Sequence, residues 1–235
     1  MMLGSDAHNA LSPLVARYAT CTTSLVGMHM LDIYGTLTSI NVRKVLWLCE
    51  EMQLDYRLHA YGSGAASVQA PEFLALNPNG LVPVLRDGTV VLWESNTICR
   101  YLAARSRRED LLPSAPAARA RVEQWMDWQA TELNPAWRYA FMATVRGSAA
   151  HTDMQCIADS VQAWNRLMAL LDAQLQQAGP YVLGAQFTLA DIVLGLSTQR
   201  WMASPIARPP LPAVAAYYAQ LCTRVGFQRH GCSAP

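Results

Sequence analysis

The sequence has little charge and no long apolar run. Charged residues make up 15% of the 235 residues, and 18 lysines and arginines nearly balance 17 aspartates and glutamates. A net charge of +1 excludes the broad basic surface that attracts nucleic acids or anionic membranes. No apolar run reaches the roughly 18–20 residues that span a bilayer. We therefore expect no nucleic-acid partner and no membrane partner.

Cysteine carries no metal or redox motif. The six cysteines are scattered, without a Cys-x-x-Cys pair or metal-type spacing. Cys49 and Cys99 stand among apolar residues at helical spacing, which predicts buried free thiols. A secreted disulfide scaffold is smaller and denser in cysteine. The sequence therefore predicts a reducing, cytoplasmic setting and no metal site.

What the sequence does contain is typical of a core-forming protein, with 52% apolar residues and seven tryptophans. Residues 1–29 lack a clear period, and they lack the basic start and long apolar stretch of a signal peptide. We expect them to be a disordered or non-native extension, with folded sequence beginning at Met30.

Residues 30–108 alternate between strand and helix patterns. The expected elements are strands 31–34, 56–60, 81–85 and 90–93 and helices 40–53, 71–77 and one from Ser95. The first strand–helix–strand unit predicts two parallel strands with a right-handed crossover. Arg43 and Lys44 are expected on the polar face of its helix. Asp87-Gly88 between two apolar runs predicts a β-hairpin.

Residues 117–228 are typical of an all-helical domain. Pro113 and Pro116 mark a linker over 109–116, and 229–235 are expected to form a tail. The expected helices are 117–146, 154–178, 189–200 and 211–224. Thr188 and Asp191 predict a capping box at one helix start.

Pro83 falls inside an expected strand, where proline removes a ladder hydrogen bond. A cis peptide before it would explain this and would turn the N–H and C=O of Val82 toward a peptide-like ligand. An edge strand that starts at Pro83 explains it equally well.

Glu94 and Ser95 stand at a strand-to-helix junction. The free N–H groups of the helix start and the Ser95 hydroxyl suit a carboxylate, and the Glu94 carboxylate suits an amino group. The pair therefore matches an amino-acid zwitterion. Ser95 acting only as a helix cap is the alternative.

The helix start at 38–41 offers the Ser39 hydroxyl to an anion. A thiol with a pKa near 8.5 is only about 3% ionised at pH 7, and lowering that pKa by two units requires about 2.7 kcal/mol. One hydrogen bond and the positive helix end together supply this amount. Ordinary helix capping by Ser39 is again the alternative.

Together and in this order, these motifs resemble those of the cytosolic glutathione S-transferases, in particular serine-type, theta- or phi-like bacterial members. The matching stretches are YGTLTSINVRKVLWLCEE, NPNGLVPVL, VLWESNTICRYLA and FTLADI. The resemblance implies a thioredoxin-like α/β domain (βαβαββα) followed by an all-α domain. It also implies glutathione as co-substrate and a homodimer.

The resemblance assigns a role to each motif. It implies that Ser39 activates the thiol, with Asn41 as a support or replacement. Val82 would pair its backbone with the cysteinyl part of glutathione, and Pro83 would be the cis proline. Glu94–Ser95 would hold the γ-glutamyl end.

Other hydroxyls compete with Ser39. Thr38 lies at the same helix end, whereas Tyr34 lies in the first strand, earlier than the activating tyrosine of the tyrosine-type classes. No cysteine occupies the loop, which argues against the cysteine-type classes.

One departure concerns the glycyl carboxylate of glutathione. Many relatives carry Lys, Arg or Gln near the position of Leu81 to contact it. Arg43, His59 or Asn79 are the candidates to replace that contact.

A second-substrate pocket is expected between the loop before Ser39 and the first long helix of the second domain. The candidates for its lining are Leu37, Trp128, Arg138, Tyr139 and Phe141. Core or dimer packing is the alternative for each. Arg138 beside Tyr139 would admit a polar or anionic electrophile.

The predicted function is a detoxifying glutathione transferase that stabilises the thiolate of glutathione and conjugates it to an apolar electrophile. One alternative is a binding protein on the same scaffold with little activity. Another is a different glutathione-dependent reaction, such as dehalogenation, peroxide reduction or isomerisation.

Overall fold

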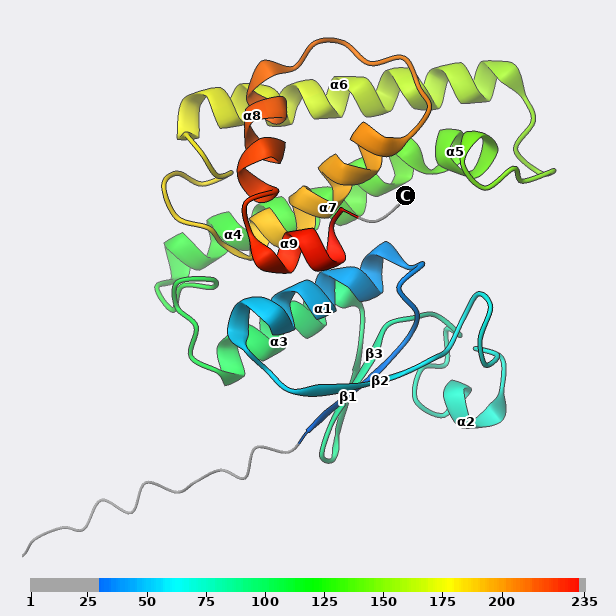
Figure 1. Cartoon of the computed structure of the whole chain (residues 1–235), viewed down its shortest axis with the longest axis vertical. Helices are drawn as coiled ribbons and strands as arrows, with labels where there is room; N and C mark the ends of the chain where they lie inside the picture. Colours follow the sequence, from blue (N-terminus) through cyan, green and yellow to red (C-terminus); the bar gives the residue numbers. More distant parts are fainter. Residues whose placement is uncertain (1–29, 233–235) are drawn as a thin grey trace, which may run out of the picture.

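The structure, a computed structural model, describes residues 30–232. The expected extension over 1–29 lies outside the described residues, as do residues 233–235. Within the described range, a mixed sheet with three helices precedes seven consecutive helical segments (Figure 1). This confirms the predicted thioredoxin-like domain followed by an all-helical domain.

The sheet has the strand order β2-β1-β3-β4. The strands are β1 (Leu31–Tyr34), β2 (Tyr56–His59), β3 (Val84–Asp87) and β4 (Val90–Trp93). β1 and β2 are parallel, and β3 is antiparallel to both β1 and β4. The predicted parallel pair of strands and the hairpin at Asp87-Gly88 are therefore both confirmed.

The first domain contains three helices: α1 (Ile40–Met52), α2 (Pro71–Leu74) and α3 (Ser95–Arg105). α1 and α3 lie between the sheet and the helical domain (Figure 1). Because helices of the second domain cover α1, the expectation of a polar outer face is wrong for Arg43 and Lys44, which are buried.

The helical domain comprises α4 (Pro116–Trp128), η1 (Gln129–Leu133), α5 (Asn134–Thr144), α6 (Met154–Ala178), α7 (Leu189–Ala203), α8 (Pro212–Leu221) and α9 (Val225–His230). The expected helix 117–146 is thus interrupted by a π-helical turn, η1. α8 ends before the predicted residue 224. The expected tail at 229 starts inside α9.

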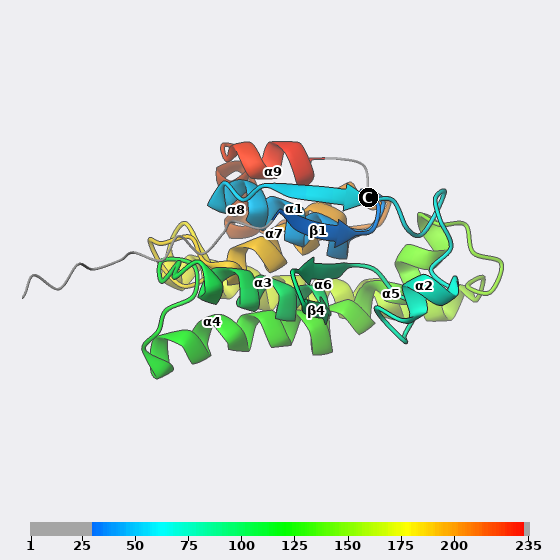
Figure 2. The same ribbon diagram turned by 90° about the horizontal axis from the view of Figure 1, so that it is seen from below.

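α7 joins the two domains. Thirteen of its 15 residues are buried, and one continuous apolar core contains residues of both domains. Gly195 lets α1 approach closely, because a Cβ at this position would lie 2.7 Å from a Leu221 methyl and 3.0 Å from the Trp47 ring. The two domains therefore pack as one unit (Figure 2 gives a second view).

The predicted capping box starts α7. The Asp191 carboxylate accepts hydrogen bonds from the Thr188 N–H (2.8 Å) and the Thr188 hydroxyl (3.1 Å). Its other oxygen accepts from the Val182 N–H at 2.9 Å. One buried carboxylate therefore satisfies three donors at the centre of the domain.

The described cysteines are all free. Cys49 and Cys99 are buried as expected, and burial raises the pKa of Cys99 to about 12. Cys156 and Cys232 are exposed. Over residues 30–232, no group of three or more His, Cys, Asp and Glu side chains is placed to hold a metal. In the same range, no helix has the length and apolar character to cross a membrane.

Candidate functional site

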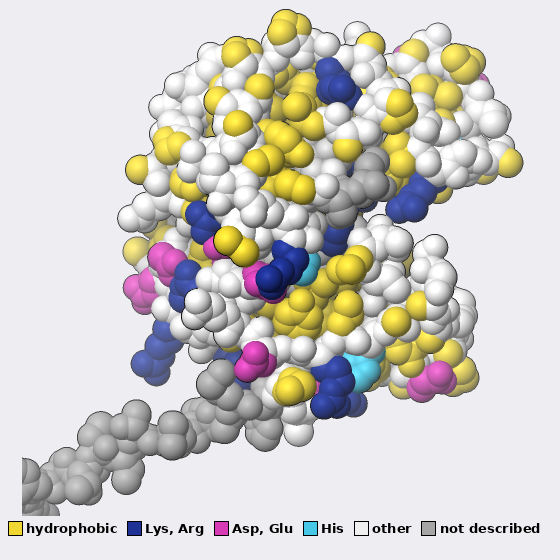
Figure 3. All heavy atoms as spheres, in the orientation of Figure 1, with side chains coloured by type: hydrophobic (Ala, Val, Ile, Leu, Met, Phe, Trp, Pro, Cys, Tyr) yellow, Lys and Arg dark blue, Asp and Glu magenta, His cyan; other side chains and the backbone are white. Residues whose placement is uncertain are grey.

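Two adjoining hollows lie where the start of α1 meets the helical domain. The α3 hollow, of about 200 Å³, is lined by Asn41, Lys44, Glu94, Ser95, Asn96, Thr97, Arg100, Asp127, Ala130 and Asn134. The α7 hollow, of about 420 Å³, is lined by Ile40, Asn41, Ala130, Asn134, Pro135, Trp137, Arg138 and Arg200. They share Asn41, Ala130 and Asn134. Figure 3 shows a notch between the domains with Lys or Arg side chains along its upper edge.

Ser39 stands at the N-terminus of α1 and its hydroxyl does not cap the helix. Its backbone N–H donates to the Thr36 carbonyl at 3.1 Å, but its side chain makes no capping hydrogen bond. The first turn of α1 contains no acidic residue. A partly exposed hydroxyl therefore lies beside unopposed positive potential, which suits a thiolate.

The rival groups near Ser39 have different surroundings. The Thr38 hydroxyl lies 2.9 Å from the Thr36 hydroxyl. Tyr34 is buried, its ring stacks on His59 with 4.6 Å between centroids, and burial raises the pKa of its phenol. Asn41 lines both hollows. Of these groups, Asn41 is therefore the closest competitor of Ser39.

The peptide between Val82 and Pro83 is cis. β3 begins after it, at Val84, and lies between β1 and β4, so the alternative of an edge strand starting at Pro83 is wrong. Among the described residues, no hydrogen bond engages the N–H or C=O of Val82. The Asn77 side-chain amide donates to the Leu81 carbonyl at 2.7 Å and so holds the preceding turn.

Glu94 has a backbone φ of +70°, an uncommon conformation for a residue other than glycine. Such conformations cost about 1–3 kcal/mol and concentrate at ligand sites. The following residue, Ser95, is buried and is the first residue of α3. Both residues line the α3 hollow beside the first turn of that helix.

Lys44, the only lysine in the chain, lies beneath the α3 hollow and is 2% exposed. Its Nζ donates to the Asn96 Oδ1 at 3.2 Å and to the Gln129 Oε1 at 3.1 Å. Gln129 begins the π turn and donates to the Asn134 Oδ1 at 2.6 Å and the Ser197 hydroxyl at 3.1 Å. This polar network connects the two domains beneath the site. A π turn in this place is typical, because such turns often occur at functional sites.

We expect Lys44 to titrate near pH 8, because burial lowers its pKa to about 8 from 10.5. Since the folded value lies below the unfolded one, its contribution to stability is smallest below pH 8 and rises as the pH increases toward 10.5. A chain labelled with isotopic lysine gives one side-chain NMR signal, whose midpoint reports this pKa directly. A midpoint above 10 would contradict the expectation.

The predicted second-substrate residues are not all brought together. Arg138 lines the α7 hollow, whereas Leu37 is 55% exposed in the preceding loop. Trp128 packs edge-on against Trp125, and Tyr139 packs likewise against His151. Phe141 is buried beneath the hollow, where an arginine of α7 covers its ring. Apart from Arg138, these assignments stay predictions without support from the lining of the hollow.

The candidates to replace a basic residue at Leu81 are engaged elsewhere. Leu81 itself is 62% exposed. The His59 Nε2 lies 2.7 Å from an Asp32 carboxylate oxygen, and the Asn79 amide donates to Asn77 at 3.0 Å. Arg43 is buried. None of the three candidates lines either hollow.

Sequence reasoning missed two buried residues, Lys44 and Arg200, and two half-buried ones, Asn96 and Asn134. The sequence pattern places Lys44 on the polar face of an amphipathic helix and assigns no environment to Arg200. The only feature of the sequence that could have revealed these residues is their position on helices that also carry site residues or apolar runs.

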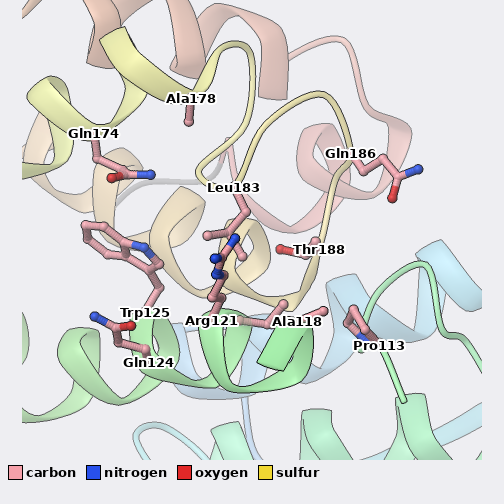
Figure 4. Close-up of a pocket in the computed structure, with 11 residues that line it drawn as sticks. Pro113, Ala118, Arg121, Gln124, Trp125, Gln174, Ala178, Leu183, Gln186 and Thr188 are labelled. Carbon is pink, nitrogen blue, oxygen red and sulfur yellow. The ribbon is translucent and has the colours of Figure 1, made fainter. Parts of the chain in front are cut away.

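A separate hollow of about 540 Å³ lies between α4 and the segment after α6 (Figure 4). Trp125 lies there beside Arg121, Gln124 and Gln174, whereas Gln186 lies on the opposite side of the hollow. It shares no lining residue with the α3 and α7 hollows. Although this hollow has the larger volume, it therefore lies apart from the helix starts at Ser39 and Ser95.

Comparison with known proteins identifies the family of the chain. Residues 38–105 match the model of the glutathione S-transferase N-terminal domain, and residues 154–220 match that of the C-terminal domain. The glutathione S-transferase GstB of Escherichia coli is 37% identical over 202 residues, which cover 85% of this chain and 97% of GstB. The chain belongs to the glutathione S-transferase family. This makes it a glutathione transferase with glutathione as co-substrate.

Two other relatives agree with this assignment. Glutathione S-transferase 3 of Zea mays is 32% identical, with 88% of this chain and 96% of the relative covered. A glutathione-bound theta-class glutathione S-transferase of Xanthomonas axonopodis pv. citri superposes with a TM-score of 0.81 at 42% identity. The superposition covers 87% of this chain and 98% of that one.

Proposed function

We propose that glutathione lies along the α3 hollow, with its thiolate at the start of α1. Ser39 donates a hydrogen bond to that thiolate, and Asn41 supports it. Glu94–Ser95 hold the γ-glutamyl end, and the Val82 backbone pairs with the cysteinyl part. The observation that carries this proposal is the uncapped Ser39 hydroxyl at an acid-free helix start.

The reaction follows from the adjoining hollows. The bound thiolate attacks an electrophile in the α7 hollow, a carbon–sulfur bond forms, and the leaving group departs with the bonding pair. The thiol proton passes to solvent before the attack. The chain contributes thiolate stabilisation and proximity, because glutathione itself is the nucleophile.

Replacing Ser95 with alanine tests the γ-glutamyl site. Loss of a hydrogen bond to a charged ligand costs about 1.5–3 kcal/mol, so we expect the Kd for glutathione to rise about 10- to 100-fold. Calorimetry measures this change. Ser114→Ala, an exposed serine of the linker, should leave the Kd unchanged. If both variants bind like the unmodified chain, Ser95 does not hold the ligand.

We also propose a homodimer, a reducing cytoplasmic setting and a role in detoxification. The edge strand β4 supports the dimer, because Val90, Val91 and Trp93 are each 37–40% exposed on it. The free cysteines support the reducing setting. Sedimentation equilibrium tests the dimer, and a Trp93→Glu variant should shift it toward monomer.

Retention on immobilised glutathione tests the affinity of the site, because the exposed Leu81 supplies no charge for the glycyl carboxylate. A chain that neither binds the resin nor turns over an aryl halide would contradict the transferase assignment.

A further inference from the structure

A buried arginine without a carboxylate partner lines the α7 hollow. Arg200 is 4% exposed. Its guanidinium lies 4.4 Å from the centroid of the Trp137 ring and 4.3 Å from that of the Phe141 ring. Its Nε is buried without a hydrogen bond, and no Asp or Glu among residues 30–232 forms an ion pair with it.

The surroundings of Arg200 are cationic. Its pKa is lowered to about 9, first by burial and then by the charges of Arg43 and Arg146. Arg138 also lines the hollow, whose eight lining residues include no Asp or Glu. Arg146 donates to the Thr38 carbonyl at 3.3 Å, so it lies close to the start of α1. An anion in the hollow would therefore meet several positive charges and no negative one.

The two aromatic rings stabilise the cation but leave its donors unused. Ring faces attract a guanidinium through their π electrons. Among the described residues, the buried Arg200 Nε has no hydrogen-bond acceptor. A buried charge without hydrogen bonds is costly. A carboxylate satisfies two guanidinium donors at once through parallel hydrogen bonds.

We propose that the α7 hollow selects electrophiles that carry a carboxylate on an aromatic or apolar body, with Arg200 as the group that binds the carboxylate. Arg138 adds attraction at the rim, and the Trp137 ring contacts the apolar body. This deepens the proposed transferase function and rests on it for the reaction. In that reaction the glutathione thiolate displaces a leaving group such as chloride, and the carboxylate remains intact.

The preference is measured first without any reaction. 3,5-Dinitrobenzoate and its methyl ester share the dinitrophenyl body and carry no chloride to displace, so they report binding alone. We expect the glutathione-loaded chain to bind the carboxylate at least about tenfold more tightly than the ester, by quenching of tryptophan fluorescence. Equal affinities, a preference for the ester, or no measurable binding of the carboxylate would overturn the proposal.

Three variants assign the preference to its residues. Arg200→Met should bind both compounds equally, with circular dichroism checking its fold. Arg138→Gln should lower the preference by a smaller factor, and the matched Arg166→Gln on the exposed side of α6 should keep it. If Arg200→Met does not fold, the other two variants still test the proposal. A weaker preference for the carboxylate in Arg138→Gln, together with an unchanged preference in Arg166→Gln, supports the charged hollow. A preference unchanged in folded Arg200→Met, or in Arg138→Gln if Arg200→Met fails to fold, would overturn the proposal.

Turnover of 4-chloro-3,5-dinitrobenzoate and its methyl ester separates this proposal from the transferase function. If the carboxylate binds selectively but neither compound is conjugated, the transferase proposal fails and the selectivity stands. If both are conjugated with equal kcat/KM and equal affinity, the transferase proposal stands and the selectivity fails.

Discussion

Replacing Asp191 with alanine is expected to lower the free energy of unfolding by about 3–5 kcal/mol. The Asp191 side chain is fully buried and accepts from two backbone N–H groups, those of Val182 and Thr188, and from the Thr188 hydroxyl. Removing the carboxylate leaves these donors without an acceptor, and each buried donor without a partner costs about 1–3 kcal/mol. This loss is a large fraction of the total stability of a typical domain, which is about 5–15 kcal/mol.

Denaturant unfolding at pH 7.5 and fixed chain concentration measures this loss. Burial raises the pKa of Asp191 to about 6, so the carboxylate is mostly ionised at that pH. Asp159→Ala is the matched control, because the Asp159 carboxylate is exposed on α6 and accepts only from Gln155 at 2.8 Å. We expect the control to lose less than about 1 kcal/mol. Similar losses in the two variants would show that the capping box does not hold the domain together.

Replacing Ser39 with alanine is expected to lower turnover of a model aryl halide by up to about 25-fold at pH 7. A thiol with a pKa of about 6.5 is roughly 76% thiolate at that pH, compared with about 3% for a pKa of 8.5. Glutathione binding should change little, because its other contacts remain. The deficit should shrink as the pH rises above 8.5, where the thiol ionises without help.

The kinetic comparison uses initial rates at saturating glutathione over pH 6.5–9.5. Ser114→Ala, on the exposed linker, should match the unmodified chain at every pH. Asn41→Ala tests whether Asn41 only supports Ser39. In that case its turnover should fall by a smaller factor than that of Ser39→Ala. Unchanged turnover in Ser39→Ala would move the activating role to Asn41, Thr38 or Tyr34.

Much of the fold could be predicted because local periodicity specifies it. The apolar period of α6 predicted residues 154–178, and the structure has the same bounds. The order of the first domain followed from alternating strand and helix patterns with turn residues between them. Thr188 and Asp191 predicted the start of α7, because a capping box is formed by residues that are close in sequence.

The buried charges could not be predicted in this way. Lys44 bonds to Gln129, 85 residues away, and only the packing of α1 beneath the helical domain explains its burial. Arg200 reads as a basic residue near a helix end, where exposure is usual. Its position between two rings of α5 depends on tertiary packing. The π turn at Gln129 has no periodicity signal for the same reason.

The candidate site contains both features that the sequence predicts and features that depend on tertiary packing. Glu94–Ser95 and Val82–Pro83 were recognisable because each motif combines a local backbone feature with a polar group. The lining of the α7 hollow was only partly predicted, since Trp128 and Tyr139 face other neighbours while Trp137 and Arg200 line it. Which side of a helix faces a cavity depends on its rotation against distant elements.

The ultraviolet absorbance of the glutathione thiolate, titrated from pH 5 to pH 10 in complexes of the unmodified chain and of Ser39→Ala, tests the central claim most directly. The proposed site predicts a midpoint about two units below the free thiol for the unmodified chain, and a midpoint near the free value for Ser39→Ala. Identical midpoints in two chains that both bind glutathione would contradict activation of the thiol by Ser39.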